Sequence, residues 1–153
     1  MKNAARDPEQ FLLSEDEHQA IFETEIRPVI FSEAESTKRP VAVVFGGQPG
    51  AGKSAALDAA LAELKPRGGA IEIVGDDLRA FHPRFAGLMA VDDQTAASYT
   101  DRDSARWVEK AIAHASEQRF SVLVEGTYRN SDVVAATMQR FRGAGYEVDA
   151  RAL

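Results

Sequence analysis

The sequence predicts an α/β fold in which a mainly parallel sheet is flanked by helices in three layers. Four apolar segments suited to strands alternate with longer segments of helical period, and this alternation is typical of a parallel sheet. The segments are VAVVF at 41–45, AIEIV at 70–74, FSVLVEG at 120–126 and YEVDARAL at 146–153. VAVVF is an uninterrupted apolar run between Pro40 and Gly46, as expected of a strand that is buried on both faces.

The helices expected around these strands follow from a cap and from apolar residues that recur with helical period. Ser14 and Glu17 have the spacing of a capping box and open a helix over 14–31, which Pro28 should kink or end. The later helices carry three apolar faces, made of Leu57, Ala60, Leu61 and Leu64, then Ala105, Val108, Ile112 and Ala115, then Val134, Met138 and Phe141.

Composition favours a single domain over residues 1–153, with the 14–31 helix packed on it. The chain is 44% hydrophobic and 27% charged, an ordinary globular composition. Its net charge of −6 gives no electrostatic reason to expect a nucleic-acid partner, and the lack of cysteine excludes disulfides and thiolate metal sites. The polar start MKNAARDPEQ does not resemble a signal peptide, and no apolar run approaches a membrane span. We therefore expect a cytoplasmic protein that does not bind membranes.

The segment GGQPGAGKS at 46–54 contains the Walker A pattern of a phosphate-binding loop, with a predicted strand before it and a helix after it. Glycines allow backbone N–H groups to turn inward around phosphates, and the positive end of the helix dipole points to the same place. Lys53 would neutralise phosphate charge and Ser54 would ligate Mg²⁺. The expected nucleotide-binding residues are Gly47, Gln48, Pro49, Gly50, Ala51, Gly52, Lys53 and Ser54.

Two carboxylates, Asp76 and Asp77, follow the second strand in the segment VGDDLRAFHP. Ligands of open α/β sheets bind beyond the carboxyl ends of strands, and an aspartate there can accept a proton from an attacking hydroxyl group. Either aspartate can instead cap the next helical turn. His82 has no metal-binding partner at a recognisable spacing, so we interpret it as a hydrogen-bonded turn residue.

Two further carboxylates are candidates for substrate binding. Glu125 ends the apolar strand VLVEGTYR in the position of a loose Walker B acid, and Arg129 follows four residues later. Glu109 lies three residues after Arg106 and about 90° from the centre of the expected apolar face of its helix, at 100° per residue. It can reach into a cleft or form a solvated ion pair with Arg106. Trp107 is expected to serve packing rather than base stacking.

Together these motifs resemble the zeta toxin family, whose members are P-loop kinases of bacterial toxin–antitoxin systems that phosphorylate UDP-N-acetylglucosamine. The likeness is carried by GGQPGAGKS, GDDLRAFHP, RWVE and VLVEGTYRN in that order and spacing, and it covers most of the chain from about residue 12. The resemblance implies a P-loop kinase-like fold that uses ATP and Mg²⁺.

The resemblance also implies roles for individual residues. Asp76 lies six residues before His82, where the family keeps its catalytic base, and Lys53 matches the family's phosphate-binding lysine. Asp77 falls on a position that is usually not acidic. The implied substrate-binding residues are Asp76, Glu109, Glu125, Thr127 and Arg129.

The implied reaction transfers the γ-phosphoryl group of ATP to the 3′-hydroxyl of the N-acetylglucosamine unit, which blocks the synthesis of cell-wall precursors. An antitoxin protein is the implied partner. Family members continue beyond the fourth strand with arginines that reach ATP, so we expect this chain to lack that C-terminal region. Two alternatives stay open: another small-molecule phosphotransferase, and an inactive remnant that binds nucleotide or antitoxin. A fourth strand at the edge of the sheet favours a homodimer.

Overall fold

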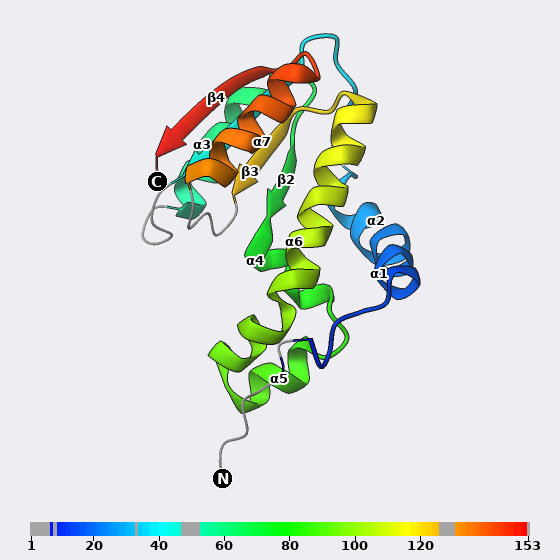
Figure 1. Ribbon diagram of the computed structural model, residues 1–153. Coiled ribbons are helices and arrows are strands. Elements are labelled where there is room, and N and C mark those ends of the chain that lie inside the picture. The colour runs from blue at the N-terminus through cyan, green and yellow to red at the C-terminus, as the bar shows by residue number, and fades with distance from the viewer. Residues whose placement is uncertain (1–6, 8, 33, 47–52, 126–130, 153) are drawn as a thin grey trace.

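The computed structural model describes residues 7, 9–32, 34–46, 53–125 and 131–152 (Figure 1). Its centre is a parallel sheet of four strands in the order β2-β3-β1-β4. The strands are β1 (Val41–Gly46), β2 (Ile71–Val74), β3 (Val122–Glu125) and β4 (Glu147–Ala152). All four predicted strands are thereby confirmed, and every residue of β3 is buried, as are the first five residues of β1.

Helices cover both faces of the sheet and give the predicted three layers. α3 (Lys53–Leu64) packs through Leu57, Ala60 and Leu64 against the face that carries Val43 and Phe45. α6 (Asp93–Gln118) and α7 (Ser131–Gly143) lie on the opposite face, where Figure 1 shows them in front of the sheet. The face predicted for α3 is confirmed, although Leu61 is only partly buried.

Shorter helical segments surround this core. Among the described residues they are α1 (Glu15–Ile21), the π-helix η1 (Phe22–Ile26), α2 (Arg27–Ile30), the 3₁₀ turn η2 (Lys65–Arg67), α4 (Gly75–Leu78), the 3₁₀ turn η3 (Arg79–Phe81) and α5 (Phe85–Val91). The capping box is present, since Ser14 accepts a hydrogen bond from the Glu17 N–H and the Glu17 side chain accepts one from the Ser14 N–H.

Pro28 lies in α2, the last helical segment of the N-terminal region, close to its end. The helix continues to Ile30, and the turn before Pro28 widens into the π-helix η1. Proline lacks an N–H group and its ring crowds the carbonyl of the turn before it. We attribute the π-helical turn to this steric conflict, because π-bulges in helices accommodate local strain of this kind.

The apolar face predicted for α6 is wrong in part. Ala105 is exposed, whereas the buried face follows Ser104, Trp107, Ala111 and Ala115. Alanine is frequent on several sides of α6, so the spacing of its apolar residues does not single out one face. The bulky indole of Trp107, which is fully buried, decides which side turns inward. The predicted packing role of Trp107 is confirmed.

The N-terminal helix is fixed to α6 by polar contacts inside an apolar interface. His18 is fully buried and stacks on Trp107 with ring centroids 4.6 Å apart. Its Nε2 lies 2.9 Å from the carbonyl oxygen of Asp103, and the Trp107 indole N–H donates to the carbonyl oxygen of His18 at 3.1 Å. The Lys110 ammonium donates to His18 Nδ1 at 2.7 Å. These bonds satisfy groups that would be costly to bury alone.

No helix among the described residues combines the length and the apolar character needed to cross a membrane.

We predict that acid destabilises the fold through His18. Burial lowers the pKa of His18 below its ordinary value of 6.5, and the Lys110 charge acts in the same direction. The unfolded chain therefore binds the proton more readily, and stability is lost as pH falls below about 6.5. Each additional proton bound by the unfolded chain changes the free energy of unfolding by at most about 1.4 kcal/mol per pH unit. Denaturant unfolding between pH 7.5 and 5 should show this slope in wild type.

The matched variants are His18→Gln, which should flatten the slope, and His114→Gln, which should leave the His18 contribution in place. The pKa of His114 is also lowered, mainly by burial, so its variant removes a second and separate contribution. An unchanged slope in His18→Gln would contradict the prediction.

Candidate functional site

The carboxyl ends of three strands meet at one edge of the sheet. Glu125, the last residue of β3, is in register with Phe45 of β1 on one side and with Val74 of β2 on the other. In the strand order β2-β3-β1-β4, the connection from β1 leads to β2 on one side of the sheet. The connection from β3 leads to β4 on the opposite side, so the direction of the connections reverses between β1 and β3. Such a reversal is the switch point at which open α/β sheets bind ligands.

The predicted phosphate loop connects β1 to α3 at this switch point. Residues 47–52, which include Gly47, Gln48, Pro49, Gly50, Ala51 and Gly52, lie outside the described residues. α3 begins at Lys53, and Ser54 is exposed in its first turn. A 12-residue helix thus follows β1 across this loop, and the N–H groups and positive dipole end of a helix start suit a phosphate.

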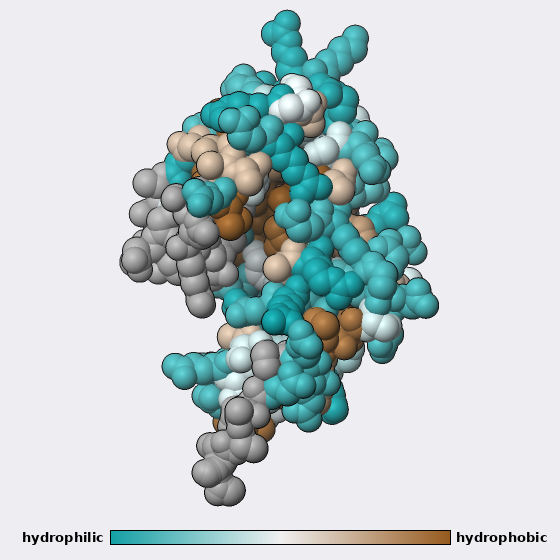
Figure 2. Space-filling view, viewed as in Figure 1, coloured by the Kyte–Doolittle hydropathy of each residue, from teal (hydrophilic) through white to brown (hydrophobic). Residues whose placement is uncertain are grey.

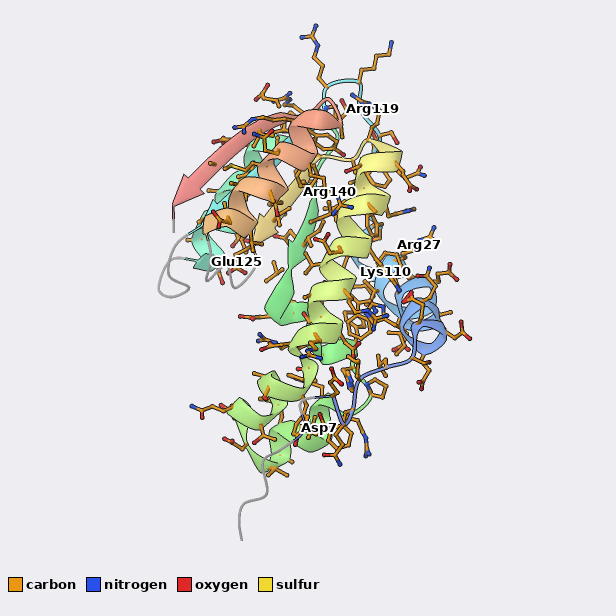
Figure 3. All side chains as sticks on the ribbon, in the orientation of Figure 1. Asp7, Arg27, Lys110, Arg119, Glu125 and Arg140 are labelled. Carbon is orange, nitrogen blue, oxygen red and sulfur yellow. The ribbon has the colours of Figure 1, made fainter. Side chains whose placement is uncertain are left out.

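Glu125 places a carboxylate at the same edge, where Figure 3 labels it at the lower end of β3. It is 2% exposed and lies between the ends of β1 and β2. A carboxylate held this deeply in an α/β core needs charged or polar partners. Thr127 and Arg129, predicted to act with it, lie outside the described residues.

Asp76 follows the end of β2, in the first turn of α4. Its Oδ1 accepts an ion-paired hydrogen bond from the NH1 group of Arg79 at 2.7 Å, and the NH2 group of Arg79 bonds to Asp101 of α6. Val74 is the N-cap residue of α4, so neither Asp76 nor Asp77 occupies that position. The side chain of Asp76 remains 36% exposed.

The backbone of this turn is held separately. The Ser104 hydroxyl of α6 donates to the carbonyl oxygen of Gly75 at 2.6 Å, and Leu78 is 2% exposed in the core. The position of Asp76 relative to α6 is therefore set by a buried hydrogen bond and by packing, in addition to the Arg79 contact.

Asp77 points to a different part of the surface. It lines a cavity of about 470 Å³ at the outer edge of β2, together with Glu72, Leu61 and Phe81. Burial raises the pKa of Glu72, and the charges of Asp58 and Asp77 raise it further. Asp77 is thus part of an acidic rim on the β2 edge.

His82 is the hydrogen-bonded turn residue that the sequence indicated. It is 2% exposed, and its Nδ1 accepts a hydrogen bond from the Arg84 N–H at 3.0 Å. Its Nε2 is 2.9 Å from the carbonyl oxygen of Phe11 and 3.3 Å from Asp103 Oδ2. His82 therefore links the turn after β2 to the N-terminal segment and to α6.

Glu109 lies on the exposed side of α6, further from the buried face than its predicted boundary position. Its ion pair is with Arg140 of α7 at 2.7 Å, not with Arg106, which contacts Asp103 and Glu15 instead. Figure 3 shows Arg140 between α7 and α6, and Figure 2 shows hydrophobic side chains at the floor of a hollow between these helices. The Glu109–Arg140 pair bridges the two helices that border this hollow.

Sequence reasoning did not assign roles to Arg79, Asp101, Ser104 or Arg140. Arg79 has a local signal, because it stands three residues after Asp76 in a helical turn. The others act from a distant part of the chain, and their partners are set by the way α6 packs on α4 and α7. Among the described residues no cluster of three or more His, Asp or Glu side chains could hold a metal ion.

The family model for zeta toxins matches residues 27–153 of this chain. This chain belongs to the zeta toxin family. The toxin PezT of Streptococcus pneumoniae is 34% identical over 113 residues, which cover 74% of this chain and 44% of PezT. A zeta toxin of Streptococcus pyogenes is 31% identical over 112 residues, which cover 73% of this chain and 38% of that toxin.

A solved structure from work on the PezAT chromosomal toxin–antitoxin system of Streptococcus pneumoniae has the same fold. It aligns with a TM-score of 0.81 at 27% identity over 96% of this chain and 59% of that structure. The P-loop kinase-like fold expected of a zeta toxin is thereby confirmed. The chain spans less than half the length of these two curated toxins.

Proposed function

We propose that this zeta toxin family chain is a cytoplasmic kinase that transfers the γ-phosphoryl group of ATP to the 3′-hydroxyl of the N-acetylglucosamine unit of UDP-N-acetylglucosamine. The observation that carries the proposal is that Glu125 ends β3 and Asp76 follows the end of the neighbouring strand β2, at the edge of the sheet from which the chain passes from β1 to α3. This placement supports the proposal, because a helix start suited to phosphate and a carboxylate suited to accepting a proton would then serve one edge of the sheet.

In this mechanism Asp76 accepts the proton of the sugar hydroxyl as its oxygen attacks the γ-phosphorus. The bond from the γ-phosphorus to the bridging oxygen breaks, and ADP leaves with that electron pair. Lys53 offsets charge on the β- and γ-phosphates, and the N–H groups at the start of α3 orient them. Glu109, Glu125, Thr127 and Arg129 hold the acceptor, as the family resemblance implies.

The residues at the switch point fit a magnesium nucleotide. Ser54 is exposed in the first turn of α3, at the strand end where the phosphates would lie, and hydroxyl oxygen is a suitable magnesium ligand. When bound, Mg²⁺ supplies charge neutralisation on the phosphates.

The first prediction of this proposal is that Asp76→Asn abolishes phosphorylation of UDP-N-acetylglucosamine. Loss of a general base removes about 10²–10⁴-fold in rate. Mass spectrometry of the product after incubation with Mg-ATP measures this, and Asp77→Asn is the matched control because Asp77 faces the β2 edge. Equal loss in both variants would contradict the assignment of Asp76.

The same assay separates the alternatives. Product formed only on another hydroxyl acceptor would indicate a different small-molecule phosphotransferase. ATP binding without product would indicate a chain that retains the nucleotide site but does not transfer the phosphoryl group. Either result overturns the proposed reaction for this chain.

The second prediction concerns the phosphate loop. Lys53→Ala should weaken ATP binding in calorimetry at least tenfold, because a charge-assisted hydrogen bond contributes about 1.5–3 kcal/mol. Lys65→Ala removes a lysine just after the far end of α3, at the start of η2, and should bind ATP like wild type. Unchanged affinity in Lys53→Ala would rule out this phosphate site.

We also propose two kinds of protein partner. The structural neighbour comes from a toxin–antitoxin system, which supports an antitoxin partner for this chain. β4 is an edge strand, since among the described residues only β1 pairs with it. The open side of such a strand can pair with a second copy of the chain.

The third prediction follows from this edge. The purified chain should show concentration-dependent dimers in light scattering, and Ala150→Lys on the exposed part of β4 should weaken them. Ala136→Lys places the same charge on the exposed side of α7 and should leave dimers intact. A monomer at every concentration, in wild type, contradicts the homodimer.

A further inference from the structure

We propose that Arg79 is a positioning residue, which orients the carboxylate of Asp76 for proton transfer and is itself held by Asp101 of α6. The inference rests on the proposed kinase function, since it concerns the group assigned as the catalytic base. It adds two residues, one next to the turn after β2 and one on the long helix, to the machinery of that site.

The contacts form a chain of three charged groups. NH1 of Arg79 bonds to Asp76 Oδ1 at 2.7 Å, and NH2 of the same guanidinium bonds to Asp101 Oδ1. The Arg79 side chain is only 16% exposed, compared with 36% for Asp76 and 44% for Asp101. Arg79 is therefore the shielded member of the group, and the two carboxylates flank it.

The geometry of Arg79 favours a role in orientation. Its Nε atom is buried and has no hydrogen-bond partner among the described residues. The guanidinium is thus fixed through its two terminal nitrogens, one bonded to each carboxylate. A planar guanidinium held at two points restricts the direction of a bound carboxylate more than the single charge of a lysine can.

Other contacts already anchor the backbone of this turn. The Ser104 hydroxyl binds the carbonyl oxygen of Gly75, and Leu78 is buried in the core. Removing the Arg79 side chain should therefore leave α4 in place while the side chain of Asp76 loses the contact with the guanidinium and is held less tightly. Phosphoryl transfer depends mainly on positioning, so this freedom should lower the rate of the chemical step.

The kinetic experiment compares Arg79→Gln, Arg79→Lys and Asp101→Asn with Arg102→Gln. Arg102 is a suitable control because it neighbours Asp101 in sequence but pairs with Glu9. We expect kcat to fall about 10²-fold in Arg79→Gln with KM changed less than about twofold, because misplacement by about 1 Å has an effect of this size. Arg79→Lys should recover part of the rate, Asp101→Asn should show a smaller fall, and Arg102→Gln should match wild type.

A second measurement does not depend on turnover. Three-bond couplings from the backbone nitrogen and carbonyl carbon to the Asp76 side-chain carboxyl carbon report its χ1 rotamers in the labelled 153-residue chain. We expect one rotamer in wild type and Arg102→Gln, averaging in Arg79→Gln, and an intermediate result in Asp101→Asn. Amide spectra of each variant show whether the fold is retained.

The two readouts separate the possible failures. A wild type that makes no phosphorylated product contradicts the proposed function, while the couplings still decide whether Arg79 fixes Asp76. A single Asp76 rotamer in folded Arg79→Gln overturns the positioning role, as does an active wild type whose kcat survives this change. A rise in KM alone would place Arg79 in substrate binding and would also overturn it.

Discussion

The buried carboxylate of Asp103 holds together two parts of the molecule that are far apart in sequence. It is fully buried in α6, accepts hydrogen bonds from the Leu13 N–H and from Arg106, and lies beside His82 Nε2. A buried charge is tolerated only where such partners offset its lost hydration, and loss of one partner typically costs about 3–5 kcal/mol. The N-terminal segment and the turn after β2 are thereby fixed to the same helix.

This arrangement explains how a short chain can align a site made from separate strands. The turn that carries Asp76 is bonded to α6 through Ser104 and through the Arg79–Asp101 contact. α6 also carries Glu109, whose partner Arg140 belongs to α7. One long helix therefore contacts both the turn that carries the candidate proton acceptor and the helix on the far side of the hollow. Any shift of α6 would move these groups together.

Some parts of the candidate site could be predicted from the sequence, and others could not. The phosphate loop and the acids at the ends of strands were predicted from sequence because their spacing within a short segment carries the chemistry. Asp76 and Asp77 could not be separated on local grounds alone, since both follow the same strand. The fold separates them, because Asp77 lines the cavity on the β2 edge whereas Asp76 contacts Arg79.

The sequence alone determined the four strands and the capping box at Ser14, because these depend on residue period and on contacts within a few residues. Tertiary structure decided which face of α6 is buried, where alanines on several sides left the helical period ambiguous. It also decided the partner of Glu109, since the expected neighbour Arg106 is drawn to Asp103 and Glu15. Those choices depend on side chains far apart in the chain, and only the packed molecule brings them within bonding distance.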